Sequence, residues 1–242
     1  IDSSDGVGGR VRTDVVDGFL LDRGFQVYLD AYPETGALLD LKALDLRKFE
    51  PGALVFNGKR LKRLMDVFRR PASAWTSATA PIGRFIDKLR VGLMRSQILG
   101  STLEQIADRE DRTTESYLRG RGFSEAMIDT FFRSFYGGIF LENELRTSSR
   151  MFEFTFKMFG QGSATLPAKG MGEIPKQLAA RLPLDSIALN QKVVSLDARS
   201  VTLSSGEQIH GRAVVLATNA AGVGSLLPEL KERMPDWRSV TN

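Results

Sequence analysis

The stretch DGVGGRVRTD, at Asp5–Asp14, decides how the rest of this sequence is interpreted. Asp2 lies just before it, and the second strand of a dinucleotide-binding βαβ unit ends in such an acidic residue, which binds ribose hydroxyls. Gly8 and Gly9 would let backbone N–H groups approach a pyrophosphate, and Arg10 would supply charged donors for phosphate oxygens. Alone, the pattern is a weak signal and more typical of a surface turn, so the surrounding sequence has to distinguish the two interpretations.

The composition excludes several classes of functional site. The 242 residues include no cysteine and a single histidine, His210, which rules out disulfides, thiolate nucleophiles, iron–sulfur clusters and Cys/His zinc sites, and no metal site is predicted. The formal net charge of +4 is small for this length, and no nucleic-acid partner is expected. The longest run without charged or strongly polar residues, FYGGIFL at Phe135–Leu141, is far shorter than the roughly 18 residues of a membrane span.

Short strands joined by a turn are predicted for residues 1–30. Val15–Val16 and Phe19–Leu21 flank Asp17-Gly18, and an Asp-Gly pair between two apolar runs is the strongest local signal for a β-hairpin. Phe56–Lys59 predicts a second turn between short strands.

The middle of the chain, from about 45 to 150, is predicted to be mainly helical. The capping-box pattern Ser101–Glu104 predicts a helix start, and Ser124 is predicted to cap the next helix. In that helix Met127, Phe131 and Phe135 recur at helical spacing, which favours a core stripe, and Gly137-Gly138 is predicted to end it.

The last part of the chain has the texture of strands again. Short strands are predicted at Val193–Asp197, Val201–Leu203 and Gln208–His210, with His210 facing solvent. The continuous apolar run Ala213–Ala217 predicts a central parallel strand covered on both faces by helices. The order is α/β, then mainly helical, then α/β, which predicts a helical domain inserted into a doubly wound one.

Over nearly its whole length the chain resembles the FAD-dependent amine oxidase and phytoene desaturase superfamily, which includes protoporphyrinogen oxidases. DGVGGRVRTD resembles the segment after the second strand of those enzymes, and Arg23–Tyr28 with Ala31–Glu34 is most similar to a phytoene-dehydrogenase-like branch of bacterial and plastid proteins. Further similar segments follow in the family's order: Gly18–Gln26, Phe131–Leu141, Thr147–Arg150, Leu166–Gly172 and Val214–Thr218.

The resemblance implies an α/β fold: a partial Rossmann-like FAD-binding domain with an inserted, mainly helical α+β substrate domain. The implied domains are 1–45 and 166–242 for FAD and 46–165 for the substrate. The family's initial G-x-G-x-x-G turn and its final Gly-Asp flavin segment are not found in these residues. We therefore expect the chain to be an internal fragment of a longer protein.

The resemblance also assigns cofactor contacts, although no catalytic residue. Asp2 would bind the adenosine ribose, and Gly8, Gly9 and Arg10 would lie along the pyrophosphate. The remaining implied contacts are Gly24, Phe25, Gln26 and Val27 near the flavin ring, Val193 at the adenine, and Thr218 and Asn219 at the end of the predicted parallel strand.

The function implied is oxidation of a lipophilic, polyene or carotenoid-like substrate, or of an amine, by hydride transfer to FAD. Apolar side chains of the helical region would form or support the substrate chamber: Met127, Phe131, Phe132, Phe135, Phe152, Phe154 and Phe156. Two alternatives remain open, a truncated non-catalytic chain that binds no flavin, and a peripheral membrane-binding module acting through the basic stretch 59–70. The expected location is the cytoplasm or a membrane surface, or a plastid if the parent protein comes from a plant.

Overall fold

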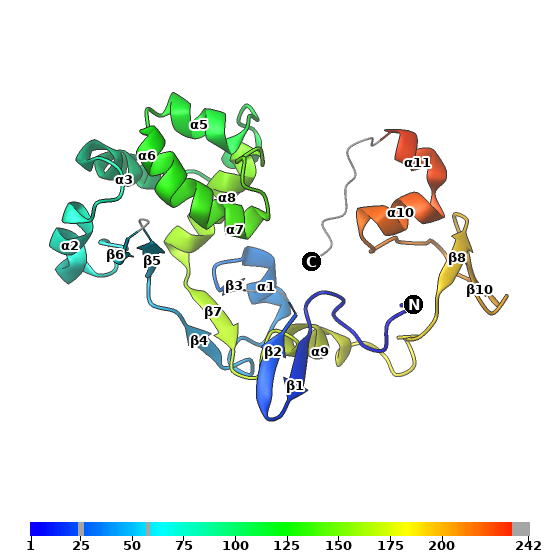
Figure 1. Ribbon diagram of the computed structural model, residues 1–242. Helices are drawn as coiled ribbons and strands as arrows, with labels where there is room; N and C mark the ends of the chain where they lie inside the picture. Colours follow the sequence, from blue (N-terminus) through cyan, green and yellow to red (C-terminus); the bar gives the residue numbers. More distant parts are fainter. Residues whose placement is uncertain (24–26, 57–58, 234–242) are drawn as a thin grey trace. The chain divides into compact units, whose positions relative to one another are not determined.

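The computed structural model describes residues 1–23, 27–56 and 59–233 (Figure 1). The chain divides into two compact units, and each is described by itself. The terminal unit consists of Ile1–Gln26, Lys42–Leu44 and Pro167–Asn242, and the helical unit consists of Val27–Leu41 and Asp45–Leu166.

The first boundary differs from the one expected at 45. Residues 27–41 belong to the helical unit because β3 (Tyr28–Leu29) pairs antiparallel with β7 (Ala164–Pro167), with Tyr28 opposite Thr165. The Thr165 hydroxyl also donates a hydrogen bond of 2.9 Å to the Tyr28 carbonyl oxygen. Backbone N–H and C=O groups need hydrogen-bond partners. Because β7 supplies the partners of Tyr28, this segment belongs to the helical unit.

The predicted hairpin near the start of the chain is confirmed. In the terminal unit, β1 (Thr13–Val16) pairs antiparallel with β2 (Phe19–Asp22). The two turn residues, Asp17 and Gly18, have φ angles of 51° and 82°. Both are left-handed, as a two-residue primed turn requires.

The three short strands predicted late in the chain are also confirmed. They form an antiparallel sheet in the order β10-β9-β8, and His210 is exposed on β10. Their bounds are Val193–Leu196 for β8, Ser200–Leu203 for β9 and Gln208–His210 for β10. The described helices of the terminal unit are α9 (Glu173–Ala179), α10 (Ala220–Leu226) and α11 (Pro228–Arg233).

The central parallel strand predicted at Ala213–Ala217 is wrong. These residues adopt no regular secondary structure, and Val215 is 87% exposed. A strand in a sheet needs a neighbour that supplies hydrogen-bond partners along its length. Among the described residues no strand pairs with this run, so its apolar pattern alone does not make it a strand.

The helical unit contains two small sheets and a group of packed helices. β4 (Leu46–Lys48) completes a sheet of order β3-β7-β4, and β5 (Gly52–Phe56) pairs with β6 (Leu61–Met65) on either side of the predicted turn, whose Asn57 and Gly58 lie outside the described residues. None of the described helices is long and apolar enough to cross a membrane. The helices are α1 (Pro33–Leu38), the 3-10 turn η1 (Pro71–Ser73), α2 (Ala74–Thr79), α3 (Phe85–Gly100), α4 (Leu103–Ala107), α5 (Thr114–Gly120), α6 (Glu125–Met127), the π-helical η2 (Ile128–Arg133), α7 (Ser134–Phe140) and α8 (Ser149–Gln161).

One of the two predicted helix starts is confirmed and the other is shifted by one residue. The Ser124 hydroxyl accepts a hydrogen bond from the Met127 N–H and begins α6. At α4 the cap is Thr102 rather than Ser101, because Thr102 and Gln105 exchange hydrogen bonds of 3.1 and 2.8 Å between their side chains and N–H groups. Gln serves as well as Glu at the third helical position, so the next residue along completes the box.

The aromatic stripe continues through the π-helical segment η2. A π-turn widens the helix by one residue and so changes which side chains face the core. Ile128, Phe132 and Tyr136 are fully buried, whereas Phe131 and Phe135 are only partly buried against the same core.

The helix does not end at Gly137-Gly138 as predicted. α7 continues to Phe140, and Leu141 closes it with a left-handed φ of 54°. Gly137 has a packing role instead, because a Cβ there would come within 2.9 Å of the Asn143 side-chain oxygen.

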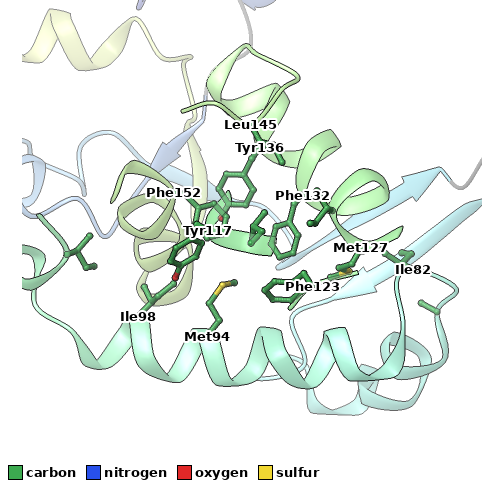
Figure 2. Packing of buried hydrophobic residues seen from close by; sticks show 14 residues of the cluster. Ile82, Met94, Ile98, Tyr117, Phe123, Met127, Phe132, Tyr136, Leu145 and Phe152 are labelled. Atoms are coloured by element: carbon green, nitrogen blue, oxygen red, sulfur yellow. The ribbon is translucent and has the colours of Figure 1, made fainter. Parts of the chain in front are cut away.

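The core of the helical unit forms where η2, α7 and α8 meet (Figure 2). The rings of Phe132 and Phe152 are fully buried with centroids 5.9 Å apart, and the Tyr136 ring lies 4.6 Å from Phe152. Most of the side chains expected around a substrate chamber therefore build or cover this packed core: Met127, Phe131, Phe132, Phe135, Phe152 and Phe156.

A buried lysine completes the end of α3. Lys157 of α8 is 6% exposed, and its Nζ donates to the carbonyl oxygens of Leu99 at 2.9 Å and Ser101 at 2.7 Å. The last carbonyls of a helix have no partner within the helix. Lys157 satisfies them, although burial lowers the pKa of its amino group.

A buried carboxylate links the starts of α3 and α6. Asp87 Oδ2 accepts from the Arg84 N–H at 2.7 Å and the Ser124 hydroxyl at 2.6 Å, and Oδ1 accepts from the Ser124 N–H at 2.9 Å. Burial alone would raise the pKa of Asp87, but the hydrogen bonds from Ser124 and Arg84 outweigh it and hold the pKa below its ordinary value.

We expect Asp87→Asn to destabilise the helical unit at pH 7 by about 1–3 kcal/mol. The side-chain NH2 group of the new Asn would face the hydrogen-bond donors of Arg84 and Ser124 in a buried site. A carboxyl with a depressed pKa stabilises the fold above its unfolded pKa and loses this contribution as the pH falls through its folded pKa. The difference between wild type and variant should therefore shrink below about pH 4. Urea denaturation at pH 7 and pH 3 measures both values.

The exposed Asp108 offers the matched control. Asp108→Asn should change the free energy of unfolding by less than about 0.5 kcal/mol at either pH. A destabilisation by Asp87→Asn that is equal at the two pH values would contradict the proposed role of its charge.

Candidate functional site

The first residues of the chain lie beside the segment that leads into β8. The Asp2 N–H donates to the Ala188 carbonyl oxygen, and the Gln191 N–H donates to the Asp2 carbonyl oxygen, both at 2.9 Å. Val193 follows shortly after Gln191 and begins β8. The structure thus brings Asp2 and Val193, the predicted ribose and adenine contacts, onto adjacent segments of the terminal unit.

The Asp2 side chain is exposed and charged at neutral pH. Its Oδ1 accepts hydrogen bonds from the Ser4 hydroxyl at 2.6 Å and the Ser4 N–H at 2.8 Å. These bonds hold the pKa of Asp2 below its ordinary value. A charged carboxylate accepts hydrogen bonds only, which suits hydroxyl donors such as those of a ribose.

The Gly8-Gly9 pair forms a left-handed turn, with φ angles of 105° and 54°. A Cβ on Gly8 would come within 2.7 Å of Pro175 Cγ in α9, so packing requires glycine there. A Cβ on Gly9 would meet no atom of the described residues within 4 Å, and Arg10, which follows directly, is exposed. The predicted pyrophosphate residues therefore form one turn that is packed at Gly8 and exposed at Gly9 and Arg10, where an anion can approach the backbone.

A network that the sequence analysis did not single out secures this region. The Thr13 hydroxyl of β1 donates to Asp22 Oδ1 at the end of β2 and accepts from the Gly172 N–H at 2.8 Å. Asp22 Oδ1 also accepts from the Met171 N–H at 2.9 Å. The hairpin is thereby joined to the turn before α9. Both segments belong to the quoted family motifs, but no sequence pattern pairs them.

Gly170 shows how closely this turn approaches the hairpin. It has a φ of 88°, and a Cβ there would lie 2.4 Å from the Cγ2 and Oγ1 atoms of Thr13. A separation under 3 Å forces the neighbour to move, so only glycine fits.

Exposed ion pairs frame the same hairpin. Arg12 Nη1 lies 2.6 Å from Asp5 Oδ1, and Arg23 Nε lies 2.9 Å from Asp14 Oδ2. Hydrogen bonds from these guanidinium groups hold the pKa values of Asp5 and Asp14 below their ordinary range. Exposed pairs of this kind contribute little to stability.

Thr218 and Asn219 lie at the start of α10. Asn219 Oδ1 accepts from the Gly222 N–H at 2.8 Å and caps the helix. A Cβ on Gly222 would lie 2.6 Å from Thr218 Oγ1. The helix start therefore accounts for the position of the Asn219 side chain, and a cofactor contact at this pair stays a prediction.

The predicted flavin contacts Gly24, Phe25 and Gln26 lie outside the described residues. Val27 is described and half-buried, and it opens the helical unit directly before β3. Among the described residues no group of three or more His, Asp or Glu side chains is placed to hold a metal ion.

We expect Gly170→Ala to destabilise the terminal unit more than Gly206→Ala. The two glycines have φ angles of 88° and 89°, but a Cβ on Gly206 would meet nothing within 4 Å in the part of the chain that the structure describes. The left-handed backbone lowers the free energy of unfolding of both variants by about 1 kcal/mol, whereas only Gly170→Ala displaces Thr13. Urea denaturation of both variants measures the difference, and equal destabilisation would show that the Thr13 network does not constrain the turn.

Comparisons with known proteins agree with the family resemblance. The family model described as flavin containing amine oxidoreductase matches residues 1–240. No match was found among curated protein sequences.

Three solved structures show the fold that the chain shares. A double mutant of a putrescine oxidase is 18% identical with a TM-score of 0.61, and the match covers 96% of this chain and 56% of that one. A candidate protoporphyrinogen oxidase from Exiguobacterium sp. 255-15 is 18% identical with a TM-score of 0.61, covering 94% of this chain and 55% of that one. Reduced UDP-galactopyranose mutase is 17% identical with a TM-score of 0.50, covering 86% and 47%.

This chain spans little more than half the length of the first two structures. At such low identity the likeness concerns the α/β fold and not the substrate. The family model, in contrast, extends over nearly all of the sequence. The chain belongs to the family of flavin-containing amine oxidoreductases.

Proposed function

We propose that this protein is an FAD-dependent oxidoreductase and that its terminal unit binds the adenosine diphosphate half of FAD. The observation that carries the proposal is the left-handed Gly8-Gly9 turn, which is exposed at Gly9 and at the following Arg10 and lies on the same segment as the charged Asp2. Family membership supports the choice of a flavin cofactor.

The residues of this region fit that half of the cofactor. Asp2 Oδ2 receives no hydrogen bond from the described residues, so it is available to ribose hydroxyls. Gly9 leaves open space where a Cβ would otherwise stand, which permits close approach of a pyrophosphate. Arg10 adds positive charge beside it, and the main chain at Val193, close to Asp2, suits the edge of an adenine.

FAD supplies the redox chemistry when bound, by accepting a hydride from the substrate. The protein's own contribution is to bind and orient the two molecules and to keep water out. This division of labour agrees with a sequence that has no cysteine and only one histidine, which lies exposed on β10.

We also propose that the terminal unit is a partial Rossmann-like FAD-binding domain and that the helical unit is the inserted substrate domain. The support is the chain order: the terminal unit is built from segments on both sides of 45–166.

The proposed substrate is a lipophilic polyene or an amine. Phe154, unlike the other aromatic residues of the predicted chamber, does not belong to the packed core; its ring stacks on Tyr32, with centroids 5.9 Å apart and planes 13° apart. Both side chains are partly exposed, and burial raises the pKa of Tyr32, so its hydroxyl is neutral at pH 7. A flat, uncharged aromatic pair suits contact with an extended apolar molecule.

A membrane contact by the β5–β6 hairpin is proposed as the source of such a substrate. Leu54 and Phe56 are 65% and 63% exposed, and they pair with Arg63 and the 62% exposed Leu61. Cross-strand partners share a face, so this face combines apolar and cationic side chains, as a peripheral membrane surface does.

Not all of the basic stretch 59–70 serves this surface. The Arg69 guanidinium donates to the Phe159 carbonyl oxygen at 3.0 Å near the end of α8, and Arg70 forms a bidentate pair with Glu50. These two arginines are held by the protein itself, which leaves the strand residues of the hairpin as the proposed contact.

We expect Gly9→Ala to weaken binding of both ADP and FAD by about tenfold, because its Cβ enters the space proposed for the pyrophosphate. Gly18→Ala is the matched control, since Gly18 also has a positive φ and open space around it but lies at the far end of β1. Isothermal titration of each variant with ADP and FAD measures the affinities. Asp2→Asn should weaken ADP binding as well.

Equal affinities of wild type and Gly9→Ala would contradict the assigned pyrophosphate contact. If wild type binds neither ADP nor FAD, the alternative of a chain that binds no flavin is favoured. ADP binding without FAD binding would support the adenosine site and place the difficulty at the flavin ring.

For the substrate, we expect the FAD-loaded protein to turn over a carotenoid presented in anionic vesicles. The double variant Phe56→Ser/Leu61→Ser should sediment together with these vesicles to a smaller extent than the wild type does. Leu184→Ser, at a residue that is 95% exposed in the terminal unit, is the control. Turnover of polar amines alone would contradict the lipophilic substrate, and unchanged sedimentation of the hairpin variant would contradict the membrane contact.

A further inference from the structure

The helical unit contains a half-open cavity of about 260 Å³ that the proposed flavin chemistry does not use. It lies between α3, the loop from α4 to α5, α5 itself and the first turns of α8. Three arginines stand around it, together with a buried tyrosine and a buried glutamate; the lining includes Gln97, Arg109, Arg112, Tyr117, Arg121 and Glu153.

Two of the arginines are held in fixed positions. Arg109 forms an ion pair with Glu153 and donates to the Ser101 hydroxyl at 2.6 Å. Arg121 donates to Gln97 Oε1 at 2.8 Å and lies 3.8 Å from Glu153. Guanidinium groups fixed in this way lose little further side-chain entropy when they bind a ligand.

The Tyr117 ring contacts the guanidinium groups of Arg112 and Arg121. Its ring is 4% exposed, and its hydroxyl donates to Glu153 (Figure 2 shows Tyr117 beside Phe152 in the core). The guanidinium carbons of Arg121 and Arg112 lie 4.6 and 5.4 Å from the ring centroid. These distances are within the range of cation–π contacts, so the ring helps to hold Arg112 at the cavity without neutralising its charge.

The charges around the cavity do not cancel. Glu153 already forms an ion pair with Arg109 and accepts a hydrogen bond from the Tyr117 hydroxyl. Glu110, the other acidic residue of the lining, is exposed. No carboxylate among the described residues lies within ion-pair distance of Arg112. Packing of the helical unit accounts for Arg109 and Glu153, but it does not account for a third arginine at the same opening.

We propose that this cavity binds the phosphate group of a small phosphorylated molecule, with Arg112 and Arg121 as its principal ligands and Arg109 as the supporting cation. Guanidinium groups match oxyanions because their planar N–H donors form paired, charge-assisted hydrogen bonds. The cavity is smaller than the roughly 300–1,000 Å³ of sites for drug-sized molecules, which fits a phosphate or pyrophosphate group and not a whole nucleotide. The site lies within the helical unit and is independent of the proposed FAD site.

The test uses inorganic phosphate and pyrophosphate as probes and the 242-residue chain as the protein. We expect saturable binding by isothermal titration, with pyrophosphate bound more tightly than phosphate. Arg112→Gln and Arg121→Gln should each weaken pyrophosphate binding by roughly tenfold or more. Arg112→Gln removes no ion pair with the described residues and only one cation–π contact, with Tyr117, so it should lower the free energy of unfolding by no more than about 1 kcal/mol and separate loss of binding from loss of structure.

Arg146→Gln is the matched control for net charge. Arg146 pairs with Glu144 on the surface, where its side chain is 78% exposed, so this variant loses the same charge away from the cavity. An equal loss of pyrophosphate binding in Arg146→Gln would show general electrostatic attraction and overturn the proposal. So would absence of binding to the wild type at millimolar probe concentration, or retention of full affinity in Arg112→Gln.

A second arm distinguishes two sources of the phosphate group. Glycerol phosphate represents a lipid headgroup, and it is compared with inorganic phosphate as a competitor of pyrophosphate. Stronger competition by glycerol phosphate supports a headgroup site, and stronger competition by inorganic phosphate supports a free-anion site. Failure of both to compete would overturn the proposal of a phosphate site.

Discussion

The terminal unit depends on one carboxylate oxygen, Asp22 Oδ1, which accepts hydrogen bonds from the Thr13 hydroxyl and the Met171 N–H. These bonds join the β1–β2 hairpin to the turn before α9, although the helical unit separates the two segments in the sequence. Hydrogen bonds to a charged acceptor are stronger than neutral ones, and glycine at position 170 lets the turn come close enough to make them. The Gly8-Gly9 turn packs on the same helix, because Gly8 lies against Pro175 of α9. This contact fixes the position of the proposed cofactor region.

The helical unit contains many short helices, and the ends of these helices leave backbone groups without partners inside the helix. Lys157 satisfies the last carbonyls of α3, Asp87 joins the starts of α3 and α6, and Arg69 reaches the end of α8. Each is a charged side chain that bonds to backbone groups at a helix end, and each would be costly to bury without these partners. The aromatic core of η2, α7 and α8 supplies the apolar burial, while these polar contacts determine how the helix ends meet.

The two proposed ligand sites recognise anions in different ways. In the terminal unit a left-handed glycine turn would offer backbone N–H groups on the same segment as the charged Asp2, an arrangement that suits a pyrophosphate joined to a ribose. In the helical unit, arginine side chains held by Tyr117, Glu153 and Gln97 offer paired donors instead. Family membership supports a flavin at the first site and is silent about the second. A shared fold does not define a substrate, and the similar structures include a mutase as well as oxidases.

The sequence by itself determined the features that depend on neighbouring residues: the Asp17-Gly18 hairpin, the Ser124 cap, the late antiparallel strands and the family. Turn geometry, caps and motifs are written within a few residues, so they can be read locally. Only the tertiary structure decided the features that depend on distant partners. Within the described part of the chain no strand pairs with Ala213–Ala217, residues 27–41 belong to the helical unit because β3 pairs with β7, and the π-turn of η2 selects which aromatic face is buried. The same holds for the Asp22 contact with Met171 and for the cavity around Arg112, because hydrogen bonds and charges act across space between residues that no local pattern connects.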